Sequence, residues 1–164
     1  MATVYTQTSG ELQLKKDNLL TTIPTLGIEW EISFEFKPEN YDNTKYTSIL
    51  HLTVGENISV LGDRIPAIFF HSKSGLHVAT SLGDDPNYHK DIIPKLPLNK
   101  WSTIVVSQIK SGAVTNLNIQ VAGTDHISVP NPTPQEFSTV KVYAADPWYD
   151  AQPGFIKGLI IKTK

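Results

Sequence analysis

The sequence contains no cysteine, which excludes disulfide bonds, thiolate metal sites and cysteine nucleophiles. It also lacks an excess of either charge: 14 basic residues face 16 acidic ones, and the formal net charge is −2. The longest basic cluster, Lys15-Lys16, is too small for a surface that binds nucleic acid or an anionic membrane. No apolar run approaches the roughly 18 residues of a membrane-spanning helix. We therefore expect neither nucleic acid nor membrane insertion.

Several site motifs are missing as well. The five histidines show no zinc-like spacing, and the chain has neither a GxSxG turn nor a glycine-rich phosphate loop. His51 and His77 alternate into polar positions of their segments, so we interpret them as ordinary strand residues. Residues 1–14 lack the basic, apolar and small-residue order of a signal peptide, so the chain either is not secreted or begins after processing.

What the sequence has in quantity is β-branched residues. Val, Ile and Thr make up about a quarter of the chain, and their stiff side chains favour strands over helices. In residues 27–36, GIEWEISFEF, apolar and polar residues alternate, which is typical of a strand with one buried and one solvated face. No window has convincing helical periodicity; residues 17–23 come nearest and are too few. Similar alternation covers 47–54, 76–81, 101–109, 114–121, 139–144 and 155–163.

Turn signals separate these segments throughout the chain. The tetrapeptides KSGA and AGTD, at 110–113 and 122–125, predict tight hairpins. Residues 38–48 and 83–99 are longer, contain prolines and aromatics, and predict surface excursions. At 164 residues the chain is most simply one domain. The pattern predicts a single all-β domain over residues 1–164, an antiparallel β-sandwich of about ten or more strands.

Residues 144–154, AADPWYDAQPG, are the first candidate site. Prolines at two positions stiffen the segment, which lowers the entropy cost of holding the aromatic residues between them. A sugar presents C–H groups that suit an aromatic face and hydroxyls that suit carboxylates. Both kinds of side chain occur within five residues: Asp146, Trp148, Tyr149 and Asp150. In the alternative reading Trp148 packs inward as a loop anchor and Asp146 caps a turn.

The adjacent residues Asp63 and Arg64 form a second candidate. In an extended segment they point in opposite directions, so at least one is expected to find a distant partner. A structural interpretation pairs Arg64 with Asp146 or Asp150, tying two loops together, because an arginine fork suits such a clamp. A functional interpretation turns both residues toward a ligand. The sequence leaves both interpretations open.

Two acidic groups allow other chemistry. Glu29, Glu31 and Glu35 lie along one strand, and alternate residues about 6.6 Å apart are near the carboxylate spacings of glycosidases. The simpler interpretation is a solvated strand face. In GDDPNYHKD, the oxygen-bearing side chains of Asp84, Asp85, Asn87 and Asp91 suggest calcium, but the spacing matches no EF-hand loop, and a turn with solvated charges is the simpler interpretation. Tyr88 and His89 of this segment could reach a ligand or another subunit.

A family resemblance joins these segments over roughly residues 27–162. It rests on WEISFEF, ILHLT, GDRIPAIFF, LHV, LPLNKWSTIVVSQ and VKVYAADPWYDAQPGFIKGLII. In this order they resemble jelly-roll lectin domains with a concanavalin-A-like sandwich, above all the small marine-invertebrate lectins that bind N-acetylglucosamine (GlcNAc). GDRIP and DPWY…PG are the most specific parts.

The resemblance implies a secreted, non-catalytic lectin that recognises N-acetylated hexosamines on glycans or glycoproteins, with a role in innate recognition. Its ligand-binding residues would be Asp63, Arg64, Asp146, Trp148, Tyr149 and Asp150. No cofactor is expected, apart from calcium at Asp84, Asp85 and Asp91. Because small lectins gain avidity by presenting several sites, we expect a homo-oligomer, with a two-fold dimer favoured. The alternatives are a glycoside hydrolase or lyase that uses Glu29, Glu31 or Glu35, and a protein-binding adhesion module.

Overall fold

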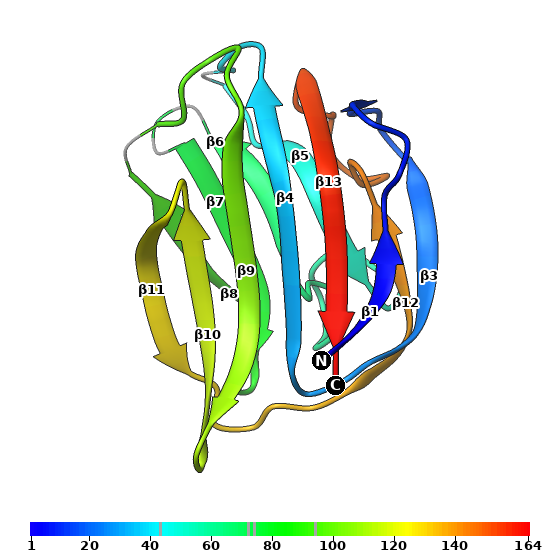
Figure 1. The fold of residues 1–164 in the computed structure, drawn as a ribbon, viewed down its shortest axis with the longest axis vertical. Coiled ribbons are helices and arrows are strands. Elements are labelled where there is room, and N and C mark those ends of the chain that lie inside the picture. The colour runs from blue at the N-terminus through cyan, green and yellow to red at the C-terminus, as the bar shows by residue number, and fades with distance from the viewer. Residues whose placement is uncertain (43, 72, 74, 94) are drawn as a thin grey trace.

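The computed structural model describes residues 1–164 except residues 43, 72, 74 and 94. It is an antiparallel β-sandwich of the jelly-roll class, which confirms the predicted fold class (Figure 1). The part of the chain that the structure describes contains no helix, and so no helix that could cross a membrane. The strands are β1 (Ala2–Thr6), β2 (Leu12–Gln13), β3 (Leu19–Leu26), β4 (Trp30–Pro38), β5 (Thr47–Thr53), β6 (Ala67–His71), β7 (Gly75–Leu82), β8 (Asp85–Ile92), β9 (Ser102–Ser111), β10 (Val114–Val121), β11 (Thr124–Pro130), β12 (Phe137–Tyr143) and β13 (Gly154–Thr163).

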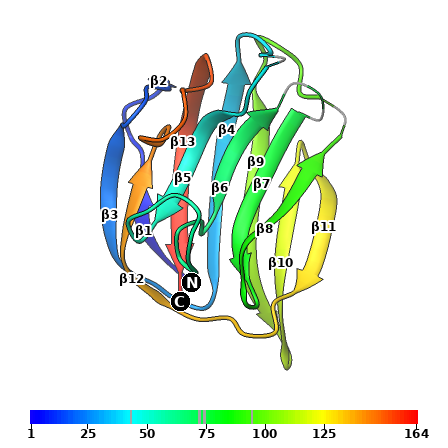
Figure 2. The same cartoon turned by 180° about the vertical axis from the view of Figure 1, so that it is seen from behind.

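Two sheets form the layers of the sandwich. The seven-stranded sheet has the order β1-β13-β4-β9-β10-β11, with β2 also pairing with β13, and faces the viewer in Figure 1. The six-stranded sheet has the order β3-β12-β5-β6-β7-β8 and faces the viewer in Figure 2. In each sheet a run of strands consecutive in sequence, β9-β10-β11 or β5-β6-β7-β8, adjoins strands from distant parts of the chain. Both termini lie at the same end of the sandwich.

The hydrophobic core fills the space between the two sheets. On β4 the alternation works as expected: Trp30, Ile32, Phe34 and Phe36 are buried, while the residues between them are partly exposed. Burying one such side chain fully stabilises the fold by roughly 1.5–3 kcal/mol relative to leaving it exposed. The facing strands of the six-stranded sheet contribute Leu50, Leu52, Ile68, Phe70, Leu76, Val78, Val140 and Val142.

The predicted strands and hairpins are largely confirmed. Each of the seven alternating segments coincides with a strand, namely β4, β5, β7, β9, β10, β12 and β13. Both short turns close hairpins, because Ser111 pairs with Val114 and Val121 pairs with Thr124. In the second turn Ala122 and Gly123 have φ angles of 50° and 81°, as a two-residue turn with two left-handed positions requires.

One predicted excursion is wrong in its first half. Within residues 83–99 the structure forms β8, which pairs with β7 along most of its length. Pro86 is compatible with a strand because β8 lies at the sheet edge, where a missing N–H costs no partner. The other predicted excursion is a connection between β4 and β5 in its described part. Asn43 and Pro94, which fall in these two segments, lie outside the described residues.

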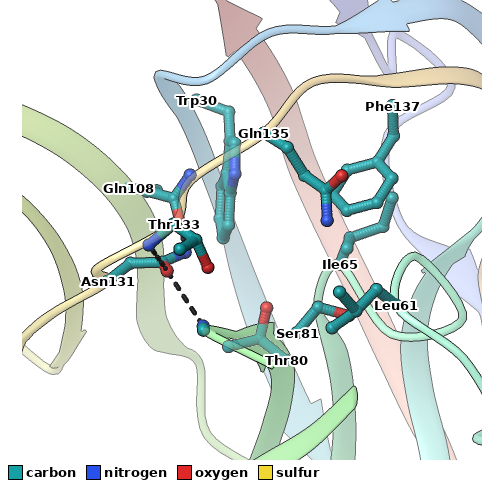
Figure 3. Close-up of a pocket in the computed structure, with 11 residues that line it drawn as sticks. Trp30, Leu61, Ile65, Thr80, Ser81, Gln108, Asn131, Thr133, Gln135 and Phe137 are labelled. Atoms are coloured by element: carbon teal, nitrogen blue, oxygen red, sulfur yellow. Dashed lines mark hydrogen bonds between the residues drawn. The ribbon is translucent and has the colours of Figure 1, made fainter. Parts of the chain in front are cut away.

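One end of the sandwich is closed by polar side chains. Asn131 bridges the sheets there: its Oδ1 accepts from the Gly83 amide at 2.9 Å, and its Nδ2 donates to Gln108 Oε1 at 2.8 Å (Figure 3). The space between the surrounding residues, which include Trp30 and Phe137, is about 10 Å³. A single water needs about this volume, so this cavity is part of the packing and does not accommodate a larger ligand.

Strand β5 is covered on both sides, including the outer face of the six-stranded sheet, which is turned away from the core. Every residue of β5 is buried, although a strand with one solvated face would alternate. A register shift between Ser48 and Leu50 turns both Ile49 and Leu50 into the core. The outward-facing side chains are buried for another reason: the connection from β5 to β6 lies over the outer face of the sheet (Figure 2), and residues 144–153 contact it as well.

Candidate functional site

The candidate site lies on the outer face of the six-stranded sheet, the face turned away from the core. Cross-strand pairing brings Phe69 of β6 next to His77 of β7 and Ser48 of β5, while Ala67 lies between His51 and Ala79. Phe69 is only 1% exposed although it does not belong to the central core cluster. Aromatic rings and two loops from distant parts of the chain therefore cover this face.

Asp146 and His51 form the centre of the buried part. Asp146 Oδ2 lies 2.8 Å from His51 Nδ1, and both side chains are fully buried. The other carboxylate oxygen accepts the backbone N–H groups of Trp148 at 3.0 Å and Tyr149 at 2.8 Å. His51 Nε2 lies 2.7 Å from the carbonyl oxygen of Asp63, so this one pair joins both loops to β5.

The electrostatics of the pair follow from these contacts. Burial raises the pKa of Asp146, but hydrogen bonds from His51, Tyr149 and Trp148 outweigh burial and hold the pKa below its ordinary value. The carboxylate is therefore ionised at neutral pH. Each ring nitrogen of His51 therefore faces an acceptor, the carboxylate at Nδ1 and the Asp63 carbonyl at Nε2. The pair is a fully buried histidine–carboxylate contact.

Arg64 also connects the two loops, the β5–β6 connection and residues 144–153, through hydrogen bonds. Its Nε donates to the Asn57 carbonyl at 3.0 Å, and its Nη1 donates to Asn87 Oδ1 of β8 at 2.9 Å. Its Nη2 donates to Asn57 Oδ1 at 3.2 Å and to the Tyr149 hydroxyl at 3.3 Å. The guanidinium carbon lies 5.0 Å from the centre of the Phe69 ring, a cation–π arrangement, and Arg64 is 3% exposed.

The pairing that the sequence suggested for Arg64 is wrong. No ion pair joins Arg64 to a carboxylate within the described residues, and Asp146 pairs with His51 instead. Asp63, which is buried, uses Oδ2 to accept the amides of Ser59 at 2.7 Å and Val60 at 2.9 Å. Arg64 still ties two loops together, but it does so through amide and hydroxyl oxygens.

A shallow, solvent-open pocket of about 40 Å³ lies beside Arg64. We call it the outer-face pocket; its lining residues are Tyr46, Arg64, Phe69, His77 and Tyr149. The Tyr46 ring centre lies 4.9 Å from that of His77, and the Tyr149 ring centre lies 4.9 Å from that of Phe69. The walls are thus mostly aromatic, and several polar atoms interrupt them.

His77 supplies one of these polar atoms. Its Nδ1 lies 2.7 Å from Asp91 Oδ1. Burial lowers the pKa of His77, and the neighbouring Asp91 offsets this effect only in part. The ring is therefore neutral at neutral pH, with the Nδ1 proton donated to Asp91 and the Nε2 lone pair left as an acceptor. His51 and His77 lie on the outer face of their strands, as the alternation predicts, but the sequence does not show that both are buried and paired there.

The predicted loop residues divide between different places. Arg64 and Tyr149 line the outer-face pocket. Trp148 does not line it: the side chain is half-buried, and its ring centre lies 5.3 Å from that of His51 and 6.4 Å from that of Tyr143. Asp150 points elsewhere: it pairs with Lys45 and, at 3.7 Å, with Lys16, and it lines a separate pocket with Tyr41.

The acidic stripe of β4 forms cross-strand ion pairs on the outer face of the seven-stranded sheet. Glu31 lies 4.0 Å from Lys162, and Glu35 lies 3.9 Å from Lys157, in register with β13. Glu29 precedes β4 and pairs with Lys164 at 3.6 Å; its pKa is lowered mainly by the hydrogen bond from the backbone N–H of residue 110. These contacts agree with the simpler interpretation of a solvated strand face.

The candidate calcium ligands do not converge. Asp85 accepts the Asn87 amide at 2.8 Å, and Asp91 binds His77. Asp85 and Asp91 lie at opposite ends of β8, which places them about 20 Å apart along an extended strand. The described residues include no group of three or more His, Asp or Glu side chains that could hold a metal ion. Calcium binding by Asp84, Asp85 and Asp91 stays a prediction.

Comparison with known proteins identifies the fold. No family model matches the chain, and no curated protein matches it in sequence. Among solved structures, the CBM40 domain of a Ruminococcus gnavus IT-sialidase, bound to α2,3-sialyllactose, has 12% identity and a TM-score of 0.64 over 98% of this chain and 91% of that one. A native heptameric SAP-like pentraxin from Limulus polyphemus has 14% identity and a TM-score of 0.59, over 94% and 71%. Domains LG4-5 of the mouse laminin α1 chain have 12% identity and a TM-score of 0.61, over 100% and 44%. At these identities the likeness concerns the fold.

Proposed function

We propose that this chain is a carbohydrate-binding domain that holds its ligand without cleaving it, and that the outer-face pocket is the binding site. The observation that carries the proposal is the pocket's composition: the rings of Tyr46, Phe69 and Tyr149 lie beside polar atoms with unused hydrogen-bonding capacity. A pyranose has C–H groups that pack on aromatic faces and hydroxyls that pair with such atoms. The fold shared with a CBM40 domain bound to sialyllactose supports carbohydrate as the ligand class.

The sugar in this proposal is an N-acetylated hexosamine such as GlcNAc. The motifs GDRIP and DPWY…PG suggest this choice, and the aromatic walls suit the methyl of an acetamide. His77 Nε2 accepts a sugar hydroxyl, because its other nitrogen is occupied by Asp91. Trp148 extends the aromatic surface next to the pocket. Asp63 and Asp146 do not contact the ligand in this proposal; they hold in place the two loops, residues 54–66 and 144–153, that carry Arg64 and Tyr149. Asp150 lines the separate pocket with Tyr41.

The biological setting belongs to the same proposal. We place the chain outside the cell, where it binds glycans or glycoproteins in innate recognition. A homodimer would present two weak sites together and thereby raise avidity. Size-exclusion chromatography with light scattering checks the oligomeric state; a monomer across the concentration range that supports glycan binding would contradict this part.

A glycan array tests the function. We expect the wild type to bind N-acetylhexosamine glycans, and Trp148→Ala and Tyr149→Phe to weaken binding while remaining folded. Trp101→Ala is the matched control, since Trp101 contacts Lys37 and Lys157 and is not part of the outer-face pocket. If folded Trp148→Ala and Tyr149→Phe both keep full binding, the site is wrong, whatever the control does.

The same experiment separates the alternatives. An array without hits, together with a stable pull-down of one protein, would favour an adhesion module. Steady release of reducing sugar from chitin or laminarin oligomers, abolished in Glu31→Gln, would establish a hydrolase. The ion pair between Glu31 and Lys162 argues against that outcome, because it holds the carboxylate against a cross-strand lysine on the sheet opposite the pocket.

A further inference from the structure

The outer-face pocket contains a buried positive charge that the described part of the chain does not neutralise. Arg64 is 3% exposed, yet its partners are two amide oxygens, a backbone carbonyl and a hydroxyl. Neither nearby acid forms an ion pair with Arg64 within the described residues: Asp91 binds His77, and Asp63 accepts two backbone amides through Oδ2 while its buried Oδ1 has no hydrogen-bond partner there. A buried arginine is normally paired with a carboxylate, because an uncompensated charge in a low-dielectric site is costly.

From this imbalance we propose that the ligand of the pocket carries a carboxylate, so that the glycan recognised is an acidic one. This inference rests on the proposed function and adds the charge of the ligand. Glucuronic-type and sialic acids share the required chemistry, a carboxylate on a pyranose ring. A uronic acid linked to an N-acetylated hexosamine presents both the acid and the acetamide within one disaccharide.

The hydrogen-bond count shows which atoms receive the carboxylate. An arginine has five N–H groups, and the four hydrogen bonds of Arg64 leave one N–H on Nη1 unused among the described residues. The Tyr149 hydroxyl accepts from Arg64 and, at 3.5 Å, from Asn57, so its own proton is free to donate. Both residues line the pocket, so the two donors are placed to bind a carboxylate in a charge-assisted pair.

The other walls complete the fit. Tyr46 is 39% exposed and has ring contacts but no hydrogen bond within the described residues, so its hydroxyl is available to the ligand. The neutral His77 ring accepts from a ligand hydroxyl, which an acidic sugar retains. Phe69 supports Arg64 from beneath and keeps water from its lower face. An acidic pyranose therefore satisfies the unused donors, the acceptor and the charge at once.

Titration calorimetry with matched ligands tests this inference. The acidic probes are hyaluronan oligosaccharides, which alternate glucuronic acid with GlcNAc, and α2,3-sialyllactose. Their neutral counterparts are carboxyl-reduced hyaluronan oligosaccharides and lactose, and chitin oligosaccharides test GlcNAc alone. We expect removal of the carboxylate to weaken binding about tenfold or more, the usual effect of losing a charge-assisted hydrogen bond. The two acidic probes distinguish a uronic from a sialic acid.

Variants connect the effect to the pocket. Arg64→Gln should abolish the preference for the acidic probe, and Tyr149→Phe, which deletes one hydroxyl, should reduce it several-fold. Because Arg64→Gln also removes loop contacts, Tyr149→Phe keeps the test valid if the first variant fails to fold. Equal affinity for an acidic probe and its reduced form overturns the inference and leaves the proposed function intact. Absence of binding to every probe overturns both.

Discussion

The contact between Asp146 and His51 should dominate the stability of the two loops, and Asp146→Asn tests this directly. An asparagine can still accept the amides of Trp148 and Tyr149 through its oxygen. Its NH₂ group, however, would face His51 Nδ1, which must then accept a hydrogen bond from it. The substitution thus replaces a buried hydrogen bond to a carboxylate with one between two neutral groups.

The expected loss is large. Losing a buried hydrogen bond to a charged group costs about 1.5–3 kcal/mol. We therefore expect Asp146→Asn to lower the free energy of unfolding by about that amount in urea titrations, with an unchanged m-value. Asp84→Asn, an exposed change at the turn before β8, is the matched control and should stay within about 0.5 kcal/mol of the wild type.

The pH dependence gives an independent check. The pKa of Asp146 is lowered in the folded state, so its stabilisation is fully present above the unfolded value of about 3.9 and is lost as the pH falls through the lower folded value. The difference in stability between wild type and Asp146→Asn should shrink below that pH. A loss under about 1 kcal/mol at neutral pH, or a difference constant down to pH 2, would refute the reasoning.

Three further changes have expected outcomes. Gly154→Ala should destabilise the fold, because the φ angle of Gly154 is +153° and an added Cβ would lie 2.4 Å from a backbone oxygen. The melting temperature should fall by about 2–4 °C for each kcal/mol lost. Gly55→Ala is the control and should change little, because a Cβ at Gly55 meets open space. Glu31→Gln should cost at most about 1 kcal/mol in denaturant titrations, since its ion pair is exposed. N-glycosylation at Asn57, in the sequon Asn57-Ile58-Ser59, should block glycan binding, because Asn57 Nδ2 lies 3.5 Å from the Tyr149 hydroxyl in the outer-face pocket. In protein from a glycosylating host, Ser59→Ala removes the sequon alone and should restore the binding measured by calorimetry.

The sheet architecture could be predicted because it depends on local alternation. In β4 every second residue is apolar, and this pattern alone identifies the strand and its buried face. Strand β8 escaped prediction because its Asp85, Pro86 and Asn87 are typical turn residues, which an edge strand tolerates. Strand β3 escaped for a related reason, since Leu19 to Leu26 carries a central Pro24 and shows no clear alternation.

The candidate site was predictable only in part. The turn-capping alternative for Asp146 describes its contacts with the Trp148 and Tyr149 amides, because such local bonds follow from sequence spacing. The partnership with His51 spans 95 residues and could not be inferred from either segment. Alternation also assigns Phe69 to the outer face, where it would be exposed unless another segment covered it. Only the folded chain reveals that cover.

The separation of these partners along the chain has a consequence for dynamics. The outer-face pocket takes its walls from the β4–β5 connection, from β6 and β7, and from the two loops that carry Arg64 and Tyr149. Opening either loop separates these two residues and removes the paired donors. A ligand that binds only the closed form stabilises that form by mass action, by about 2.7 kcal/mol at a concentration of 100 times Kd. Hydrogen exchange should therefore slow on glycan binding mainly in residues 54–66 and 144–153. Equal slowing in β10 and β11, which lie at the far edge of the other sheet, would mean that the ligand acts on the whole fold and not on the loops.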